Sequence, residues 1–265
     1  MARIIAITNQ KGGVGKTTTA VNLGASLGSL GKNVLLVDLD PQSNSTSGVG
    51  VVPAEVIHST YTVLAGSSSP GEAVLGTKAS GLYVLPANRD LTGAEIELVY
   101  LENRELVLKE RIVPIIYKHD FIIVDCPPSL GLLTVNALAA CEGIIIPLQC
   151  EYYAMEGVSA LIETLDMVRA SLNAGLALDG VLLTMFDTRN SICHQVAEQA
   201  RQYFGEKVFR TVIPRNVRLS ESPSFGVPIL LYDPGSRGAQ SYLELAREML
   251  ARHAPPGGDD ERSEA

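Results

Sequence analysis

The sequence predicts an α/β fold: one domain in which a mostly parallel, twisted sheet carries helices on both faces. Two observations support this fold class. Short apolar runs alternate along the chain with stretches of helical pattern. Within each run the apolar residues are nearly continuous, which is typical of strands that are buried on both faces. Since strand–helix–strand units join parallel strands by right-handed crossovers, a doubly covered parallel sheet follows.

The apolar runs give the strands in chain order. They are predicted at 3–8 (RIIAIT), 33–40 (NVLLVDLD), 82–87 (LYVLPA), 121–127 (FIIVDCP), 143–149 (GIIIPLQ), 178–186 (LDGVLLTMF) and 207–214 (KVFRTVIP). Helices are predicted at 16–30, 101–118, 131–140, 155–173, 190–204 and 236–252. Residues 50–80 have weak periodicity and many small residues, so we expect a loop with short helices. We assign the domain to 1–252 and expect 253–265 to be a disordered acidic tail, because that segment has no apolar anchor.

Composition and charge limit the function classes. No apolar run reaches the ~18 residues of a membrane-spanning helix, and we expect no signal peptide before Arg3, where the first strand begins. The four cysteines (Cys126, Cys141, Cys150 and Cys193) form no C-x-x-C pair, which indicates reduced core cysteines in a cytosolic protein. The net charge of −8 argues against nonspecific attraction of the whole molecule to nucleic acid, so such binding would depend on local charge.

A glycine-rich loop, NQKGGVGKTTT (9–19), stands between the first strand and the first helix. Its cradle consists of Gly12, Gly13, Val14 and Gly15. Glycine permits the backbone angles that turn successive N–H groups toward an anion at a helix N-terminus. We expect Lys16 to reach the β- and γ-phosphates of a nucleotide, Thr17 to hold Mg²⁺, and Thr18 to lie near the α-phosphate. A strand, this loop and a helix in succession predict a P-loop NTPase.

The loop departs from the common pattern G-x-x-x-x-G-K-[ST] at its start. Gln10 stands where that pattern has glycine, and a second lysine, Lys11, follows it. Because Lys16 already supplies a positive charge to the phosphates, a second cation in the same loop would add little to the binding of the same nucleotide.

Carboxylates for a metal–phosphate site stand at the ends of two predicted strands. FIIVDCPP ends in Asp125, which is the usual Walker B position and holds the Mg²⁺ shell. VLLVDLDPQ offers Asp38 and Asp40, which strand alternation directs to the same side. We expect Asp38 to lie nearer the metal shell and Asp40 to orient or activate the attacking water for in-line phosphoryl transfer.

Three motifs at these spacings resemble the deviant Walker A ATPase family: KGGVGKTTT, VDLDPQ and IIVDCPPSLG. Within it, the closest resemblance is to the chromosomal ParA/Soj proteins of bacterial DNA segregation. Further matches are QCEYYAMEG (149–157), TVIPRNVRLSESPSFG (211–226) and the following ILLYDPGSRGAQSY. The resemblance covers roughly residues 2–250.

The resemblance implies an ATPase with ATP and Mg²⁺ as cofactors and a slow basal turnover. In that family two subunits form a sandwich dimer around two ATP molecules, and the lysine that matches Lys11 reaches the nucleotide held by the partner subunit. Pro214, Arg215 and Asn216 then become candidates for contacts with the adenine, and Met185 for packing on the same ring. Glu151 and Tyr152 are expected near the dimer or the nucleotide.

The resemblance also implies nonspecific binding of double-stranded DNA and a ParB-type centromere-binding partner that stimulates hydrolysis. Residues 189–218 contain six basic and two acidic residues, a net charge of +4, which leaves −12 for the rest of a chain that totals −8. Within this segment Arg189 and Arg218 match arginines on the family's DNA-binding face. Contacts of this kind with the DNA backbone give salt-sensitive binding without sequence preference. The expected location is the cytoplasm, on the nucleoid when ATP is bound.

Two other classes share the loop. A MinD-like positioning ATPase would carry a basic amphipathic helix at its C-terminal end, whereas this sequence ends in PPGGDDERSEA, so we expect no membrane partner. A small-molecule P-loop enzyme would require a substrate pocket, for which the sequence offers no separate candidate. An iron–sulfur relative would require a cysteine pair that bridges subunits, and we find no match.

Overall fold

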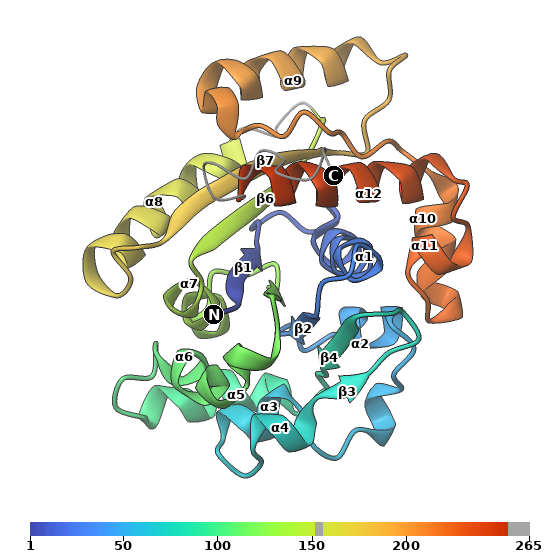
Figure 1. Ribbon diagram of the computed structural model, residues 1–265. Coiled ribbons are helices and arrows are strands. Elements are labelled where there is room, and N and C mark those ends of the chain that lie inside the picture. Colours follow the sequence, from blue (N-terminus) through green and yellow to red (C-terminus); the bar gives the residue numbers. More distant parts are fainter. Residues whose placement is uncertain (152–155, 254–265) are drawn as a thin grey trace, which may run out of the picture.

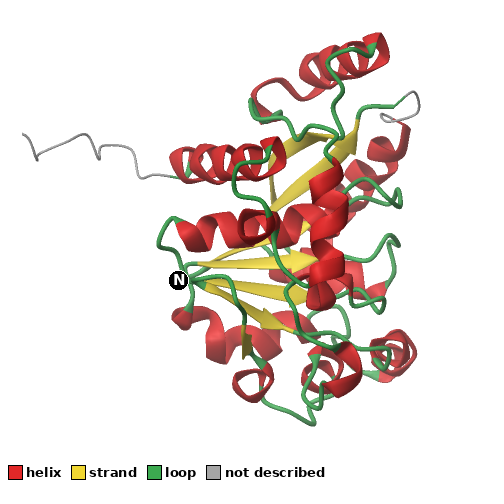
Figure 2. Ribbon diagram, turned by 90° about the vertical axis from the view of Figure 1, so that its right-hand side faces the viewer, coloured by secondary structure: helices red, strands yellow, loops and turns green. Residues whose placement is uncertain are grey.

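A seven-stranded sheet between two layers of helices forms the protein (Figures 1 and 2). The computed structural model describes residues 1–151 and 156–253. The strand order is β3-β4-β2-β5-β1-β6-β7, and every neighbouring pair is parallel except β3 and β4. The predicted fold class is confirmed. The predicted tail, apart from His253, and Tyr152 lie outside the described residues.

The strands are β1 (Arg3–Ile7), β2 (Val34–Asp38), β3 (Leu75–Gly76), β4 (Leu82–Leu85), β5 (Phe121–Asp125), β6 (Gly143–Gln149) and β7 (Ala177–Thr184). The α-helices are α1 (Lys16–Ser29), α2 (Asn44–Gly48), α3 (Thr60–Leu64), α4 (Pro70–Ala73), α5 (Leu91–Glu97), α6 (Val107–Ile112), α7 (Leu132–Ala140), α8 (Glu156–Ser171), α9 (Ser191–Phe204), α10 (Val217–Glu221), α11 (Ile229–Tyr232) and α12 (Arg237–Arg252). Short 3₁₀ helices are η1 (Pro53–Glu55), η2 (Leu98–Tyr100), η3 (Val113–Lys118), η4 (Gly205–Lys207) and η5 (Ser222–Phe225).

Alternate side chains of the central strands enter two separate hydrophobic cores. In β1, Ile4 belongs to the core beneath α7 and α8, whereas Ile5 belongs to the core beneath α1 and α12. In β2, Leu35 and Leu36 divide in the same way. Both faces of the sheet are therefore covered, which explains why the apolar runs in the sequence are continuous.

Local capping sets the start of two long outer helices. The side chain of Asn190 accepts a hydrogen bond from the Ile192 N–H and caps α9, and Ser236 caps α12 through the Ala239 N–H. The buried residues of α12 recur at helical spacing: Ala239, Tyr242, Leu245, Ala246 and Met249. The predicted helices at 190–204 and 236–252 are thus confirmed to within one residue at their starts.

The predicted strand 207–214 is wrong. This segment touches β7 only at its two ends: it makes isolated bridges, Val181 with Val208 and Phe186 with Pro214, and the Phe209 and Ile213 N–H groups donate to β7 carbonyls. Between these contacts the N–H groups of Arg210 and Thr211 donate to the carboxylate of Glu248 on α12, both at 2.9 Å, so the ladder with β7 is interrupted.

The predicted helix 101–118 is also wrong in its extent. The α-helix occupies only Val107–Ile112, and the chain continues as a 3₁₀ helix from Val113. Pro114 cannot donate a backbone hydrogen bond, which prevents continuation of the α-helical ladder. Before the helix, Asn103 has a positive φ of 53°, which marks a turn. The sequence also gave no signal for α5 or for the two-residue edge strand β3 within the expected loop region.

All four cysteines are free and buried, as expected. None of the described helices is long and apolar enough to cross a membrane.

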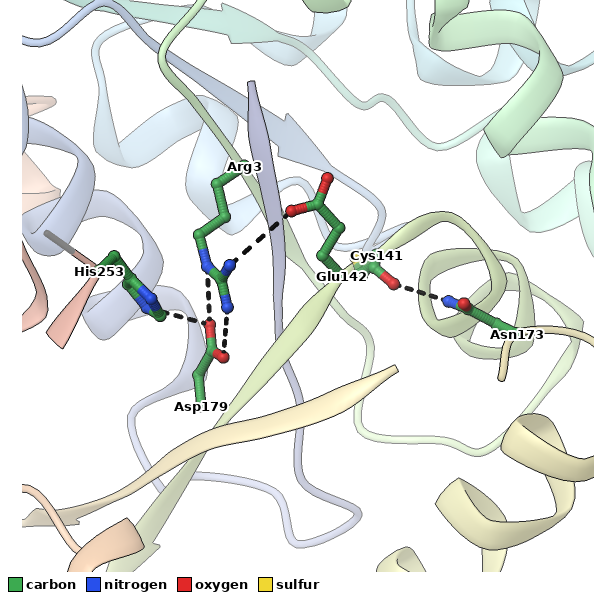
Figure 3. Close-up of polar contacts among 6 residues, drawn as sticks. All are labelled: Arg3, Cys141, Glu142, Asn173, Asp179 and His253. Atoms are coloured by element: carbon green, nitrogen blue, oxygen red, sulfur yellow. Dashed lines mark hydrogen bonds and ion pairs between the residues drawn. The ribbon is translucent and has the colours of Figure 1, made fainter. Parts of the chain in front are cut away.

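A buried ion pair joins the start of β1 to β7 (Figure 3). Arg3 donates from Nη2 to Asp179 Oδ1 at 2.6 Å and from Nε to Oδ2 at 3.3 Å. The side chain of Asp179 is only 5% exposed, whereas that of Arg3 is 28% exposed. Glu142 and His253 approach the same pair at 3.8 and 3.5 Å. The cluster lies at the amino ends of the strands, away from the phosphate loop, and we assign it a structural role.

We expect Arg3→Met to lower the free energy of unfolding by about 2–3 kcal/mol, because the buried Asp179 carboxylate loses the guanidinium group that pairs with it. Urea denaturation followed by circular dichroism measures this change. Arg104→Met is the matched control: its partner Glu105 is more exposed, and we expect a loss below ~1 kcal/mol. Equal losses in the two variants would contradict a structural role for the Arg3 cluster.

Candidate nucleotide-binding and catalytic site

The glycine-rich loop lies at the carboxyl edge of the sheet, between the end of β1 and the start of α1. Gly13 and Gly15 have φ angles of +75° and +91°, a region that residues with a Cβ rarely adopt. Two side chains fix the loop from outside. Asn9 Nδ2 donates to Pro147 O at 2.7 Å, and Thr184 Oγ1 donates to Val14 O at 2.8 Å. The predicted cradle is therefore held in place by β6 and β7.

Lys16 is the buried cation of this loop. Its residue is only 7% exposed, and its Nζ donates to Lys11 O across the loop at 3.2 Å. Burial lowers the pKa of Lys16, and the nearby acidic groups of Asp125, Cys126 and Asp40 oppose that shift. Lys16 thus lies between the loop and the predicted metal carboxylates.

Asp38 and Asp125 face each other at the ends of neighbouring strands. They are direct register partners in the β2–β5 pairing, and both are fully buried. Burial raises the pKa of each carboxyl, and for Asp125 the nearby Asp38 adds to the shift. A buried carboxylate pair of this kind favours a bound cation, which offsets the repulsion.

Hydroxyl groups at the start of α2 hold the two carboxylates. Ser45 Oγ donates to Asp125 Oδ2 at 2.7 Å. Thr46 donates to Asp38 Oδ2 from its N–H at 2.8 Å and from its Oγ1 at 2.6 Å, while the Asp40 N–H donates to Asp38 Oδ1 at 3.2 Å. Both oxygens of Asp38 therefore have partners.

The residues fit a magnesium ion. Asp125 Oδ1 is buried and has no hydrogen-bond partner among the described residues, so it is available as a ligand. The Thr17 and Ser45 hydroxyls both lower the pKa of Asp125, opposing the effect of burial. The described residues contain no group of three His, Cys, Asp or Glu side chains that could hold a metal. A Mg²⁺ ion held by Asp125 would take its remaining ligands from phosphate oxygens and water.

Asp40 is nearly buried, at 7% exposure, and extends beyond the end of β2. Its Oδ1 accepts a hydrogen bond from the Gln42 N–H at 2.9 Å. The predicted roles of Asp38 in the metal shell and of Asp40 toward the attacking water stay predictions.

The adenine-side residues predicted from the sequence come together beside the loop. Met185, Pro214, Arg215 and Asn216 line a pocket of about 460 Å³ together with Gly15. The bridge between Phe186 and Pro214 brings the two segments side by side. Met185 has a positive φ of 50°, a costly backbone for a side chain of this size, which is typical of functional sites.

Further lining residues of this pocket gave no recognisable signal in the sequence. They include Thr184, Leu219, Pro223 and Tyr242. The Tyr242 hydroxyl lies 3.2 Å from Thr19 Oγ1 and links α12 to α1. Ser45 and Thr46 were also missed, although the run of hydroxyls directly after DLDPQ is a signal that could have revealed them.

The comparisons with known proteins agree with this geometry. A family model described as an AAA domain matches residues 2–178. The chromosome partitioning protein ParA of Myxococcus xanthus is 54% identical over 255 residues, which cover 96% of this chain and 90% of that protein. The sporulation initiation inhibitor protein Soj of Bacillus subtilis is 55% identical over 251 residues, 95% of this chain and 99% of that protein.

The chain belongs to the ParA/Soj family of chromosome-partitioning ATPases. The fold of this chain is also similar to that of a solved structure, cobyrinic acid a,c-diamide synthase from Mycobacterium smegmatis with bound ADP and magnesium. It superposes with a TM-score of 0.82 at 38% sequence identity and covers 93% of each chain.

The lysine expected to mark this ParA/Soj subfamily lies at the mouth of the loop. The side chain of Lys11 is 39% exposed, and its Nζ lies 3.4 Å from Glu151 Oε2, itself 52% exposed. The loop therefore presents one buried and one accessible lysine. Glu151 therefore lies beside Lys11, and its expected place near the dimer or the nucleotide stays a prediction.

The two arginines predicted to contact DNA are both exposed and both paired. Arg189 forms a two-point contact with Asp187 and lowers the pKa of that carboxyl to about 2. Arg218 lies on α10, 2.9 Å from Glu221 and 3.4 Å from Asp233. Exposed pairs of this kind are weak because solvent screens them, so a phosphate group can displace them.

Proposed function

We propose that this protein is an ATP-dependent switch for chromosome or plasmid segregation. The ATP-bound form is a sandwich dimer that binds double-stranded DNA without sequence preference, and a ParB-type partner stimulates hydrolysis and releases it. The observation that carries the proposal is the contrast within one loop between buried Lys16 and accessible Lys11.

ATP is the proposed nucleotide, with its phosphates in the glycine-rich loop and its adenine in the pocket of Met185 and Pro214. Thr17 and Asp125, with Asp38 behind them, would hold Mg²⁺, which neutralises the phosphate charge when bound. The Mycobacterium smegmatis relative solved with ADP and magnesium supports this pair of cofactors.

Lys11 makes the dimer depend on the nucleotide. Its ammonium group is accessible at the loop mouth and is held only by an exposed ion pair with Glu151, which costs little to break. A lysine that reaches the phosphates of a second subunit adds attraction across the interface while ATP is present. Hydrolysis removes that charge and loosens the dimer.

DNA binding rests on the basic segment 189–218. Arg189 and Arg215 come from loops that a backbone hydrogen bond from Arg215 N to Phe186 O holds together, and Arg218 follows on α10. A dimer joins two such patches, so the second contact benefits from a high effective concentration. The acidic remainder of the chain disfavours binding by a monomer.

A slow basal rate fits the site. An arginine finger supplies about 10³–10⁵ in rate to related phosphoryl transfers. Among the described residues we assign no arginine as such a finger in cis; Arg215 lines the adenine-side pocket. A ParB-type partner that completes the site would make hydrolysis conditional on its arrival. We place the protein in the cytoplasm, on the nucleoid when ATP is bound.

Light scattering tests the switch directly. We expect a monomer with ADP, a dimer with slowly hydrolysed ATP, and retention of that dimer on double-stranded DNA at low salt. A metabolite that raises turnover in place of DNA and partner would instead favour a small-molecule P-loop enzyme. Failure of the ATP-bound protein to bind DNA at low salt would overturn the DNA-binding role.

Arg218→Glu separates dimerisation from DNA binding. We expect it to dimerise with ATP yet lose DNA affinity by about tenfold or more at 50 mM salt, with a shallower dependence on salt, because each phosphate contact contributes to that slope. Arg104→Glu, on the surface before α6, serves as the control. Loss of dimerisation in Arg218→Glu would indicate a structural role instead.

A further inference from the structure

The Ser45 hydroxyl contacts the carboxylate that is predicted to hold the metal. Ser45 is fully buried on α2, and its Oγ donates to Asp125 Oδ2 at 2.7 Å. A hydroxyl has one proton to donate and an ionised carboxylate only accepts, so the direction of this hydrogen bond is fixed. The bond joins two segments that are far apart in the chain, the helix after β2 and the end of β5.

The two oxygens of Asp125 have different surroundings. Oδ2 accepts from Ser45, whereas Oδ1 is buried and has no hydrogen-bond partner among the described residues. Buried polar atoms almost always have a partner, and a cation can serve as one. Rotation of an aspartate carboxyl about its last torsion is soft, so a hydrogen bond to one oxygen also sets the direction of the other. Ser45 therefore fixes the direction in which Oδ1 points.

Asp125 lies beside the start of the phosphate loop. In the pairing of β1 with β5 it is the register partner of Ile7, the last residue of β1. The Cys126 N–H donates to Ile7 O at 3.2 Å and holds the two strand ends together. The unpartnered oxygen of Asp125 thus belongs to the edge of the sheet at which the nucleotide phosphates are proposed to bind.

Thr46 anchors α2, so that Ser45 has a defined position. Thr46 donates to Asp38 Oδ2 from its N–H and its Oγ1, and the same Oγ1 accepts from the Ala87 N–H at 2.9 Å. These bonds tie α2 to the end of β2 and to the segment after β4, and Figure 1 shows α2 beside both strands. The chain enters α2 through Ser43, whose φ of 57° is costly for a residue with a side chain and is typical of functional sites.

We propose that Ser45 is a positioning residue for the metal: its hydroxyl holds Asp125 Oδ2 so that Oδ1 stays available to Mg²⁺. The proposal rests on the metal site of the proposed function, since it takes Asp125 as the metal carboxylate. Hydrogen bonds to the groups that bind a metal typically contribute about 10–100-fold to its affinity. Ser45 therefore raises the affinity for Mg²⁺ independently of any step of hydrolysis.

Electron paramagnetic resonance of Mn²⁺, the probe used in place of Mg²⁺, measures metal affinity in the ADP complex of the full chain, where no turnover occurs. We expect Ser45→Ala to raise the dissociation constant of Mn²⁺ about tenfold, because the carboxylate loses the hydrogen bond that orients it. Ser45→Thr keeps a hydroxyl donor and should restore the affinity to within about threefold of the wild type.

Ser47→Ala is the matched control, because Ser47 lies exposed on the same helix and its Oγ donates to the Ser43 backbone carbonyl. Its affinity for Mn²⁺ should match that of the wild type. Without metal, the affinity for ADP should be the same in Ser45→Ala, Ser47→Ala and the wild type, because Ser45 acts through the carboxylate and not on the nucleotide. Thermal melting verifies that each variant is folded.

Asp125→Asn separates the failure of this proposal from that of the metal site. It removes the charge of the carboxylate and should weaken Mn²⁺ binding more than Ser45→Ala does. Wild-type Mn²⁺ affinity in Asp125→Asn would overturn the metal role of Asp125, and the role of Ser45 with it. A loss in Asp125→Asn without a loss in Ser45→Ala would overturn the positioning role alone. An equal loss of metal-free ADP affinity in Ser45→Ala would show that Ser45 only stabilises the fold of the site, which also overturns the proposal.

Discussion

Lys16→Ala is expected to weaken ATP binding by about 10²-fold or more, because truncating one member of a buried, charged contact typically costs about 2–5 kcal/mol. The surroundings of Lys16 make the loss severe. Its ammonium group is buried close to Asp125 and Asp40, so the variant leaves these carboxylates facing the phosphates without a balancing cation. Titration with a fluorescent ATP analogue measures the change.

Lys109→Ala is the control, because Lys109 lies exposed on α6. Its ATP affinity should match the wild type, and circular dichroism should show both variants folded. An affinity loss below tenfold in Lys16→Ala would mean that the backbone N–H groups of the loop carry most of the phosphate binding.

Asp40→Ala should reduce the rate of hydrolysis by about 10²–10⁴, the usual contribution of a general base, while ATP affinity stays within a few-fold. Asp40 extends beyond β2, and its Oδ1 accepts only a local hydrogen bond from the Gln42 N–H. Asp38 is fully buried, and hydrogen bonds from Thr46 and Asp40 occupy both its oxygens. Asp40 is therefore the freer of the two to contact water.

The variant should accumulate as an ATP-bound dimer that stays on DNA, which single-turnover phosphate release and light scattering detect together. Asp90→Ala, an exposed acid near the start of α5, should hydrolyse ATP at the wild-type rate. Normal turnover in Asp40→Ala would indicate that Asp38, not Asp40, activates the attacking water.

Several elements could be predicted because their information is local. The phosphate loop needs glycine at positions of positive φ, and the helix that follows begins at Lys16 as expected. The carboxylate of Asp125 ends a strand, and the carboxyl ends of parallel strands meet at one edge of a sheet, so its place beside the loop followed. The adenine-side pocket came from the family resemblance, not from any local rule.

The errors concern segments whose hydrogen-bond partners are distant in sequence. Residues 207–214 have the composition of a strand, yet Glu248 on α12 accepts the N–H groups of Arg210 and Thr211 and interrupts the pairing with β7. The helix expected at 101–118 was cut short by a turn at Asn103 and by Pro114. Propensity describes the isolated segment, whereas tertiary partners decide between conformations of similar free energy.

The sequence by itself determined the alternation of strands and helices, the glycine-rich loop with its two lysines, and the carboxylates at strand ends, because these depend on spacing along the chain. Only the tertiary structure decided which hydroxyls hold Asp38 and Asp125, and that Lys16 is buried while Lys11 is accessible. These properties arise where segments far apart in sequence pack together. The burial of a side chain and its hydrogen-bond partners, unlike helix or strand propensity, cannot be determined from any single segment of the sequence.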